Sequence, residues 1–120
     1  MSAARAKGTR GEQFFLPYLR QLFGPQVERA PLKGTLDYGD YTGVPYLVEA
    51  KNTSKPLFQK WARICKKKAG DDWTLWWMGD RRTEDGEPLV LMPLSKYMIL
   101  ELDAQKGRRK PTKKDRTVDL

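Results

Sequence analysis

The spacing of hydrophobic positions changes several times along the chain, and each change marks a predicted element. In residues 8–23, hydrophobic side chains such as Phe15 and Leu19 recur at intervals of three or four, which predicts an amphipathic helix. Residues 44–51 and 73–78 are instead short apolar runs, which are typical of buried strands. Because residues 73–78 are apolar on both faces, we expect them to form a central strand.

A second helix is predicted for residues 55–69, with Ser54 as its N-cap, Pro56 in its first turn and Gly70 after its end. The residues expected on its apolar face are Leu57, Trp61, Ile64 and Cys65. The remaining predicted elements are strands at 26–31, around 40–42 and at 88–92, and a short last helix at 94–103. This order predicts an α/β fold in a single domain, with a central mixed β-sheet flanked by α-helices.

Length and charge add further constraints. A chain of 120 residues suits one domain, and a hydrophobic content of 39% is enough for one small core. The net charge is +8, and residues 106–120, with seven Lys or Arg and two Asp, contribute +5 of it. We therefore expect a folded domain at 1–105 and a flexible basic tail at 106–120. An anionic partner is favoured, nucleic acid ahead of a membrane, because no basic amphipathic helix stands out.

Several classes of protein are excluded by what the sequence lacks. No apolar run is long enough for a transmembrane helix, and the N-terminus lacks the apolar stretch of a signal peptide, so we expect a cytoplasmic protein. The chain has one cysteine and no histidine, which excludes an internal disulfide, a Cys/His zinc site and a histidine base. A metal would need oxygen ligands, which favours Mg²⁺, Mn²⁺ or Ca²⁺.

The candidate chemistry lies in residues 39–51. Glu49 and Lys51 are two positions apart at the end of an apolar strand, so their side chains are predicted to share one face. Asp40 precedes Glu49 by nine residues, and a hairpin would bring the two carboxylates together. Neighbouring carboxylates repel unless a cation lies between them, so the pair predicts a divalent cation, with Mg²⁺ the first candidate. The alternative is that Glu49 and Lys51 form an ordinary ion pair on a strand surface.

At these residues the chain resembles the PD-(D/E)xK nuclease superfamily, and most closely the archaeal-type Holliday junction resolvases, including phage-borne members. The resemblance spans roughly residues 5–103. It rests on a basic, glycine-bearing N-terminus at 5–8, on Glu12 in the first helix, on the Gly39-Asp40 step and on Glu49-Ala50-Lys51. It implies a restriction-endonuclease-like core. The usual proline before the first aspartate is Gly39 here, and Asp37 competes with Asp40 for the metal role. Asp40 is preferred because the residues after it lead directly into the strand.

The resemblance also implies a role for each site residue. Asp40, Glu49 and the backbone carbonyl of Ala50 would bind the metal, which would be Mg²⁺, with Mn²⁺ able to substitute. Glu12 would complete the metal site directly or through water. Lys51 would orient or activate the attacking water.

The activity implied is that of a metal-dependent, structure-specific endodeoxyribonuclease that resolves four-way (Holliday) junctions by paired symmetric nicks. Its partners would be branched DNA and a second copy of the chain, without a membrane or a small-molecule substrate. Two features of the sequence support the dimer, namely a strand at 73–78 that needs cover on both faces, and the apolar residues of the last helix. The candidate DNA-binding residues are Arg5, Lys7, Arg10, Asn52, Thr53, Lys55 and Gln59.

Three alternatives stay open. The first is a nuclease of the same fold that acts on other DNA structures. The second is a non-catalytic basic DNA-binding module, in which the acidic residues are incidental. The third is an RNA-associated protein, which would leave the paired acids unexplained. For Trp73, Trp76 and Trp77, stacking on bases is possible in principle, but packing in the core is the preferred interpretation because they lie on an apolar strand.

Overall fold

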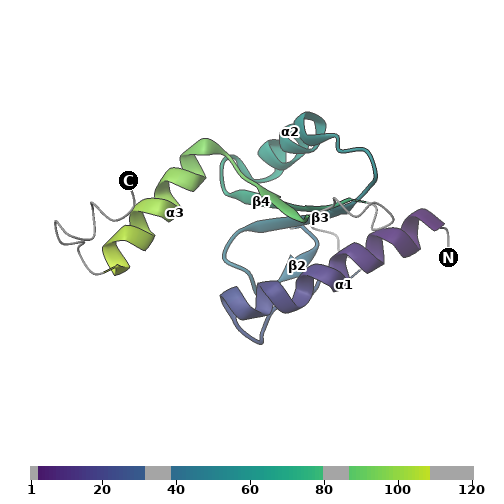
Figure 1. Cartoon of the computed structure of the whole chain (residues 1–120), viewed down its shortest axis with the longest axis horizontal. Coiled ribbons are helices and arrows are strands. Elements are labelled where there is room, and N and C mark those ends of the chain that lie inside the picture. The colour runs from purple at the N-terminus through teal and green to yellow at the C-terminus, as the bar shows by residue number, and fades with distance from the viewer. Residues whose placement is uncertain (1–2, 32–38, 80–86, 109–120) are drawn as a thin grey trace.

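A computed structural model describes residues 3–31, 39–79 and 87–108, with only the backbone described for residues 3–7 (Figure 1). The elements, in chain order, are α1 (Ala3–Phe23), β1 (Glu28–Arg29), β2 (Tyr41–Thr42), β3 (Leu47–Asn52), α2 (Phe58–Ala69), β4 (Trp73–Met78), β5 (Leu89–Leu91) and α3 (Leu94–Gly107). This is the predicted order of helices and strands, and it confirms a mixed α/β fold.

The strands form two small sheets rather than the one central sheet that was predicted. β3, β4 and β5 form a mixed sheet in which β3 and β4 are parallel and β5 is antiparallel to β4. β1 and β2 form a separate antiparallel pair, which an isolated parallel bridge between Gly39 and Val48 connects to the larger sheet. The loop between β2 and β3 contains Pro45, which has no N–H to donate to a ladder, so pairing does not continue through it.

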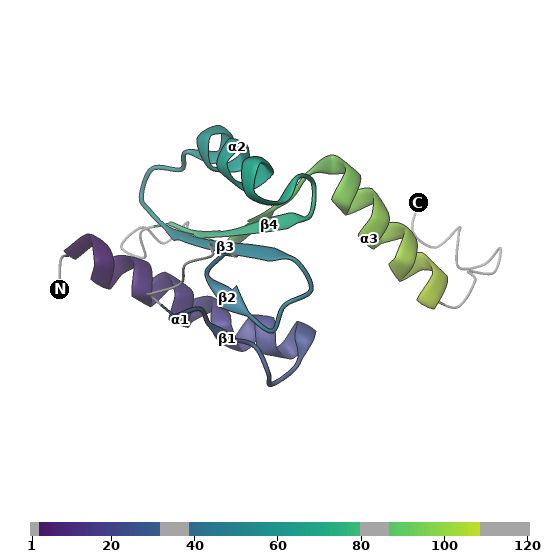
Figure 2. The ribbon, with the colours of Figure 1, turned by 180° about the vertical axis from the view of Figure 1, so that it is seen from behind.

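The larger sheet lies between two helices, as Figure 2 shows, with α2 over one face and α1 over the other. Trp76 and Met78 face α1, where they join Phe15 and Leu19 in a buried cluster. On the other face of β3 and β4, the strand residues Leu47, Trp73 and Leu75 pack against α2, where Trp61 and Cys65 complete a second buried cluster. The prediction of a central strand at 73–78 is confirmed. Because both of its faces are covered within one chain, this strand gives no support for a dimer.

The start of α2 differs from the prediction. The helix begins at Phe58 with Leu57 as its N-cap, so Ser54 and Pro56 lie before it. Of the four residues expected on its apolar face, Trp61 and Cys65 are buried, whereas Leu57 and Ile64 are exposed. The end of the helix is as predicted, because the N–H of Gly70, at a φ of +64°, donates to the Lys66 carbonyl.

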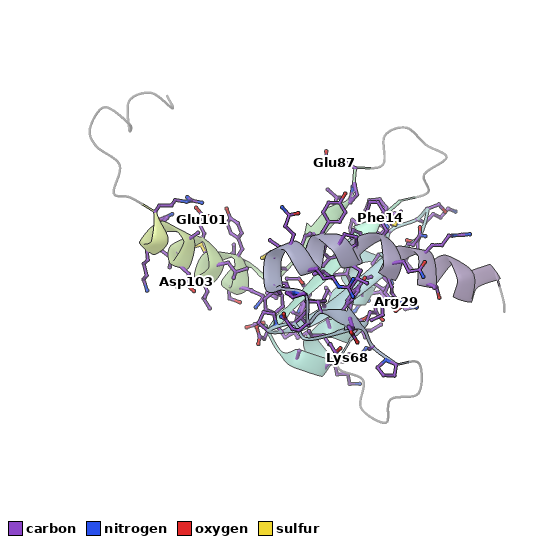
Figure 3. The ribbon with its side chains drawn as sticks, turned by 90° about the horizontal axis from the view of Figure 1, so that it is seen from below. Phe14, Arg29, Lys68, Glu87, Glu101 and Asp103 are labelled. Atoms are coloured by element: carbon purple, nitrogen blue, oxygen red, sulfur yellow. The ribbon has the colours of Figure 1, made fainter. Side chains whose placement is uncertain are left out.

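The last helix is longer than predicted and extends away from the sheet. α3 runs to Gly107, and Glu101 and Asp103 lie on the part of it beyond the sheet (Figure 3). The predicted boundary at residues 105 and 106 falls inside this helix, and residues 109–120 of the predicted tail lie outside the described residues. Within the described ranges, no helix has the length and hydrophobicity needed to cross a membrane.

Candidate functional site

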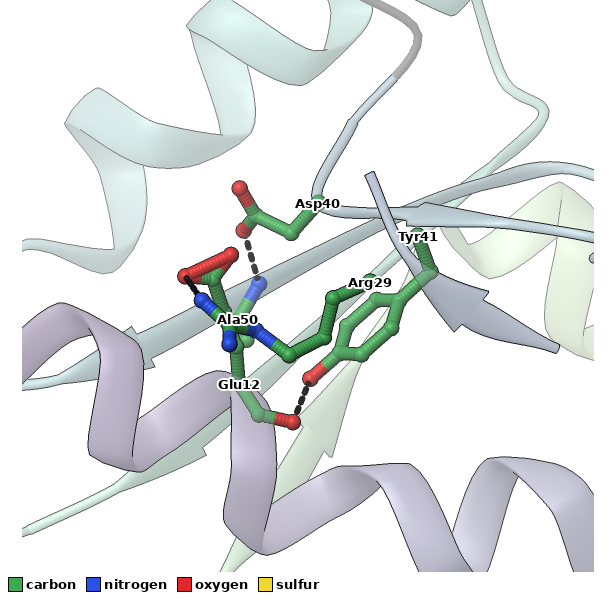
Figure 4. Close-up of polar contacts among 5 residues, drawn as sticks. All are labelled: Glu12, Arg29, Asp40, Tyr41 and Ala50. Carbon is green, nitrogen blue, oxygen red and sulfur yellow. Dashed lines mark hydrogen bonds and ion pairs between the residues drawn. The ribbon is translucent and has the colours of Figure 1, made fainter. Parts of the chain in front are cut away.

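Backbone pairing places Asp40 against the edge of β3. The N–H of Asp40 donates to the Val48 carbonyl at 2.9 Å, and Asp40 Oδ2 accepts a hydrogen bond from the Ala50 N–H at 2.7 Å (Figure 4). Gly39 permits this approach, because its φ is +101° and an added Cβ would lie 2.7 Å from the Val48 carbonyl oxygen. The predicted hairpin is therefore wrong, because the bridge between Gly39 and β3 is parallel. This parallel bridge nevertheless places Asp40 beside Glu49, as the hairpin was expected to do.

Asp40 and Glu49 interact strongly. Burial, followed by the negative charge of Glu49, raises the pKa of Asp40 to about 8, against the opposing effect of the Ala50 hydrogen bond. A carboxyl–carboxyl hydrogen bond with Glu49 and the more distant charge of Glu12 raise it further. Without a cation, the pair therefore shares a proton near neutral pH. A divalent cation would replace that proton and allow both carboxylates to ionise.

Glu49 also meets a lysine that sequence reasoning did not single out. Its side chain is buried on the α2 side of β3, and its Oε1 lies 2.9 Å from Lys68 Nζ in the last turn of α2. Glu49, Lys51 and Lys68 together line a small pocket. The Nζ of Lys51 lies 5.7 Å from the centroid of the Trp61 ring. Glu49 and Lys51 thus share one face, as predicted. The available signal for Lys68 was its helical spacing from Trp61 and Cys65, which puts it on the same side of α2.

Glu12 approaches from the opposite face of the sheet. α1 comes close to the end of β3 because Gly11 contacts Asn52, where an added Cβ would lie 2.9 Å from the Asn52 Cβ. The Glu12 carboxylate lies 3.7 Å from Arg29 Nη2, and the Glu12 carbonyl accepts a hydrogen bond from the Tyr41 hydroxyl at 2.6 Å (Figure 4). Burial raises the pKa of Glu12, and Arg29 opposes that shift.

Arg29 is a second cation that the sequence did not single out. Its guanidinium is held between Glu12 and the Asp40 region by the short β1–β2 pair. Among the described residues, its buried Nε has no hydrogen-bond partner. A two-residue strand carries too little pattern to reveal this placement from sequence.

The candidate DNA-binding residues are dispersed. Arg10 and Lys55 are exposed, and the Thr53 hydroxyl accepts a hydrogen bond from the Trp77 indole and donates to the Lys55 carbonyl. Gln59 does not join the carboxylates. It lines an apolar groove with Phe58 and Ala62, on a different side of α2 from Lys68. The side chains of Arg5 and Lys7, and the whole of Asp37, lie outside the described residues.

The donor set fits a hard cation in chemistry but contains few ligands. The half-buried Asp40 and the buried Glu49 supply two carboxyl groups that share a proton, which is the arrangement that a divalent cation stabilises. Within the described ranges, no group of three or more His, Cys, Asp or Glu side chains is placed to hold a metal ion. Glu12 is engaged by Arg29, and Glu49 by Lys68. A metal would therefore have to compete with a lysine for Glu49.

Comparisons with known proteins return no family model, no curated protein and no solved structure that matches this chain.

Proposed function

We propose that the protein is a Mg²⁺-dependent endodeoxyribonuclease with a restriction-endonuclease-like core, which resolves four-way DNA junctions by paired symmetric nicks. The observation that carries this proposal is the adjacent carboxyl pair of the half-buried Asp40 and the buried Glu49, with Lys51 on the face of Glu49. Burying two adjacent acids is costly unless the site uses them, and a chain with a net charge of +8 suits a polyanionic substrate.

In this proposal each residue has a defined task. Asp40, Glu49 and the Ala50 carbonyl hold the cation, and Mn²⁺ can take the place of Mg²⁺. When bound, the metal supplies Lewis-acid stabilisation of phosphate charge and a more acidic water. Lys51 orients the attacking water, while Glu12 completes the metal site directly or through water. The product is a nicked phosphodiester.

The substrate class follows from charge and symmetry. Phosphate contacts from exposed cations such as Arg10 and Lys55 provide affinity without base readout, so recognition depends on the shape of branched DNA. Two symmetric nicks require two active sites related by a two-fold axis, and a homodimer supplies them. No membrane or small-molecule substrate is part of the proposal.

One observation favours a second candidate, a non-catalytic basic DNA-binding module. The ammonium of Lys68 already balances the charge of Glu49, and a shared proton balances Asp40, so the acidic pair is tolerated without any metal. In such a module the carboxylates would serve only to join β3 to the Asp40 segment and to α2.

The two candidates separate in a cleavage assay. An end-labelled four-way junction and a linear duplex of matched sequence would each be incubated with Mg²⁺, with Mn²⁺ and with EDTA. We expect paired nicks in the junction only, which depend on the metal and are lost in Asp40→Asn. Asp103→Asn, an exposed acid on α3, is the matched control and should cut like the parent. Tight junction binding without cleavage would instead establish the binding module, and equal cutting of both DNAs would remove the junction specificity.

A further inference from the structure

We infer that α3 carries the surface through which two copies of this chain associate, with Leu94, Met98 and Leu102 at the centre of the contact. The inference builds on the homodimer that the proposed function requires, and it names the surface.

One side of α3 is attached to the domain through Lys96. This lysine is buried, its Nζ forms an ion pair with Asp72 Oδ1 at 2.5 Å, and its ammonium lies 3.6 Å from the centroid of the Tyr46 ring. Lys96 therefore defines which side of the helix faces the rest of the chain. Met98 lies about 160° around the helix from Lys96 at the ordinary helical rotation.

The opposite side of α3 carries an exposed apolar stripe, with Glu101 and Gln105 beside it. Leu94, Met98 and Leu102 follow one another at intervals of four residues, and their exposed fractions are 76%, 51% and 51%. Tyr97, Ile99 and Leu100 on the same helix are also each more than a third exposed. At the ordinary helical rotation Leu100 lies on the Lys96 side, so the surface open to one partner is the Leu94, Met98 and Leu102 stripe with Tyr97 and Ile99 on its flanks. A second copy would thus supply the cover that the monomer lacks.

The stripe is also self-complementary. Leu94 and Leu102 lie at equal distances in sequence on either side of Met98. When two α3 helices pack antiparallel about a two-fold axis through Met98, Leu94 of each copy meets Leu102 of the other, and the two Met98 side chains meet each other. The stripe can therefore pair with a second copy of itself about a two-fold axis.

The charge of α3 argues against the other possible occupants. Residues 94–107 contain two acidic and two basic side chains, so this helix carries none of the chain's excess positive charge. DNA and anionic membranes both need clustered cations at their contact. A partner face without net charge, such as another α3, imposes no such need.

The first test is the mass of the full-length chain by sedimentation velocity across a concentration series, without DNA. We expect a monomer–dimer equilibrium, and Met98→Lys should weaken dimerisation by more than about tenfold because it places two ammonium groups at the two-fold axis. Leu22→Lys, at an equally open apolar position on α1, is the matched control and should associate like the parent. A parent that is monomeric throughout, or a Met98→Lys chain that still dimerises like the parent, would overturn the inference.

A cross-linking variant keeps the test informative should Met98→Lys fold poorly. Met98→Cys should form an intermolecular disulfide under mild oxidation, whereas Leu22→Cys and the parent should not, since the only native cysteine, Cys65, is buried. Equal cross-linking of Met98→Cys and Leu22→Cys would contradict the proposed surface. Neither assay involves cleavage, so the two proposals can fail separately. A dimer without nuclease activity would overturn the proposed function, whereas a monomeric nuclease would overturn the inference about α3.

Discussion

The half-buried carboxyl of Asp40 is subject to opposing electrostatic effects. It is held on one side by a backbone N–H of β3, which favours its charged form, and crowded on the other by Glu49, which disfavours it. Burial and crowding prevail, and the pKa of Asp40 rises to about 8. The group is thus protonated near neutral pH in the absence of a cation, although an exposed aspartate would be ionised.

This raised pKa predicts a pH-dependent stability. Between about pH 4 and pH 8 the folded chain binds a proton that the unfolded chain releases, so the free energy of unfolding falls as pH rises through that range. Asp40→Asn keeps the acceptor for the Ala50 N–H but cannot ionise. Between pH 5 and pH 8 its free energy of unfolding should therefore fall less than that of the parent, by roughly 2 kcal/mol. Urea unfolding at pH 5 and pH 8 in EDTA measures the difference.

Added Mg²⁺ provides the complementary measurement. It should stabilise the parent at pH 8 and stabilise Asp40→Asn much less, because one of the two ligands is then uncharged. The matched control is Asp103→Asn, whose pH dependence and response to Mg²⁺ should equal those of the parent. An identical pH dependence in parent and Asp40→Asn would disprove the shared-proton interpretation.

Lys68 makes a second prediction at the scale of one residue. Lys68→Met removes the ammonium 2.9 Å from Glu49 and leaves a buried carboxylate without its nearest cation. Since a quarter of the Lys68 side chain is exposed, the expected loss in EDTA is modest, about 1–2 kcal/mol. Mg²⁺ should recover part of that loss, because the metal and Lys68 compete for the same carboxylate. Lys67→Met, one position away and exposed, is the control, and an equal response in both variants would count against the competition.

At the scale of elements, two glycines let separate segments approach closely enough to build the site. Gly11 allows α1 to contact the end of β3, and Gly39 allows the Asp40 segment to bridge to Val48. The helices then bring charge to β3 from both faces, with Glu12 arriving on α1 and Lys68 on α2. The short β1–β2 pair adds Arg29 beside Glu12. The position of each charge therefore depends on packing between elements.

The Gly39 bridge can be tested by adding one methyl group. Gly39→Ala should destabilise the chain by about 1–3 kcal/mol, because alanine disfavours a φ of +101° and its Cβ would clash with the Val48 carbonyl. Gly8→Ala is the matched control, since that helical position has open space within 4 Å among the described residues and alanine favours a helix. Thermal unfolding should shift downward for Gly39→Ala and slightly upward for Gly8→Ala. The same upward shift in both would show that the bridge is unimportant.

At the scale of the whole molecule, positive charge gathers toward the C-terminal end of the sequence. Residues 106–108 belong to the end of α3 and its cap, where Arg108 pairs with Glu101, while residues 109–120 carry five basic and two acidic side chains. The net charge of +3 in this terminal segment is a large part of the net charge of +8 of the chain. We therefore expect the segment to strengthen binding to DNA.

Replacing residues 109–120 by a neutral Gly/Ser segment of equal length should weaken junction binding and make it less sensitive to salt. Each lost phosphate contact lowers the slope of log affinity against log salt by about 0.9. Fluorescence anisotropy across a salt series measures this slope, and Asp40→Asn should keep the parent value. An unchanged slope would show that the terminal cations do not contact phosphate.

The order of elements, the central position of the strand at 73–78 and the shared face of Glu49 and Lys51 were all predictable from sequence. Each depends on the period of a helix or a strand, which a few neighbouring residues determine. The same local information gave a wrong N-cap for α2, because the Thr53 hydroxyl bonds to the Lys55 carbonyl and the helix begins only after Leu57. It also predicted a hairpin where the structure has a parallel bridge.

The partners of the acidic residues depended on tertiary structure. Lys68 lies 19 residues from Glu49 and Arg29 lies 17 from Glu12, and no local pattern links either pair. Gln59 was expected at the site, but the rotation of α2 about its axis turned it toward an apolar groove and Lys68 toward Glu49. That rotation follows from burial of Trp61 and Cys65 against β3 and β4. The sequence alone thus determined which residues carry the charge. Packing of distant segments decided which charges meet, because ion pairs act through space and periodicity acts along the chain.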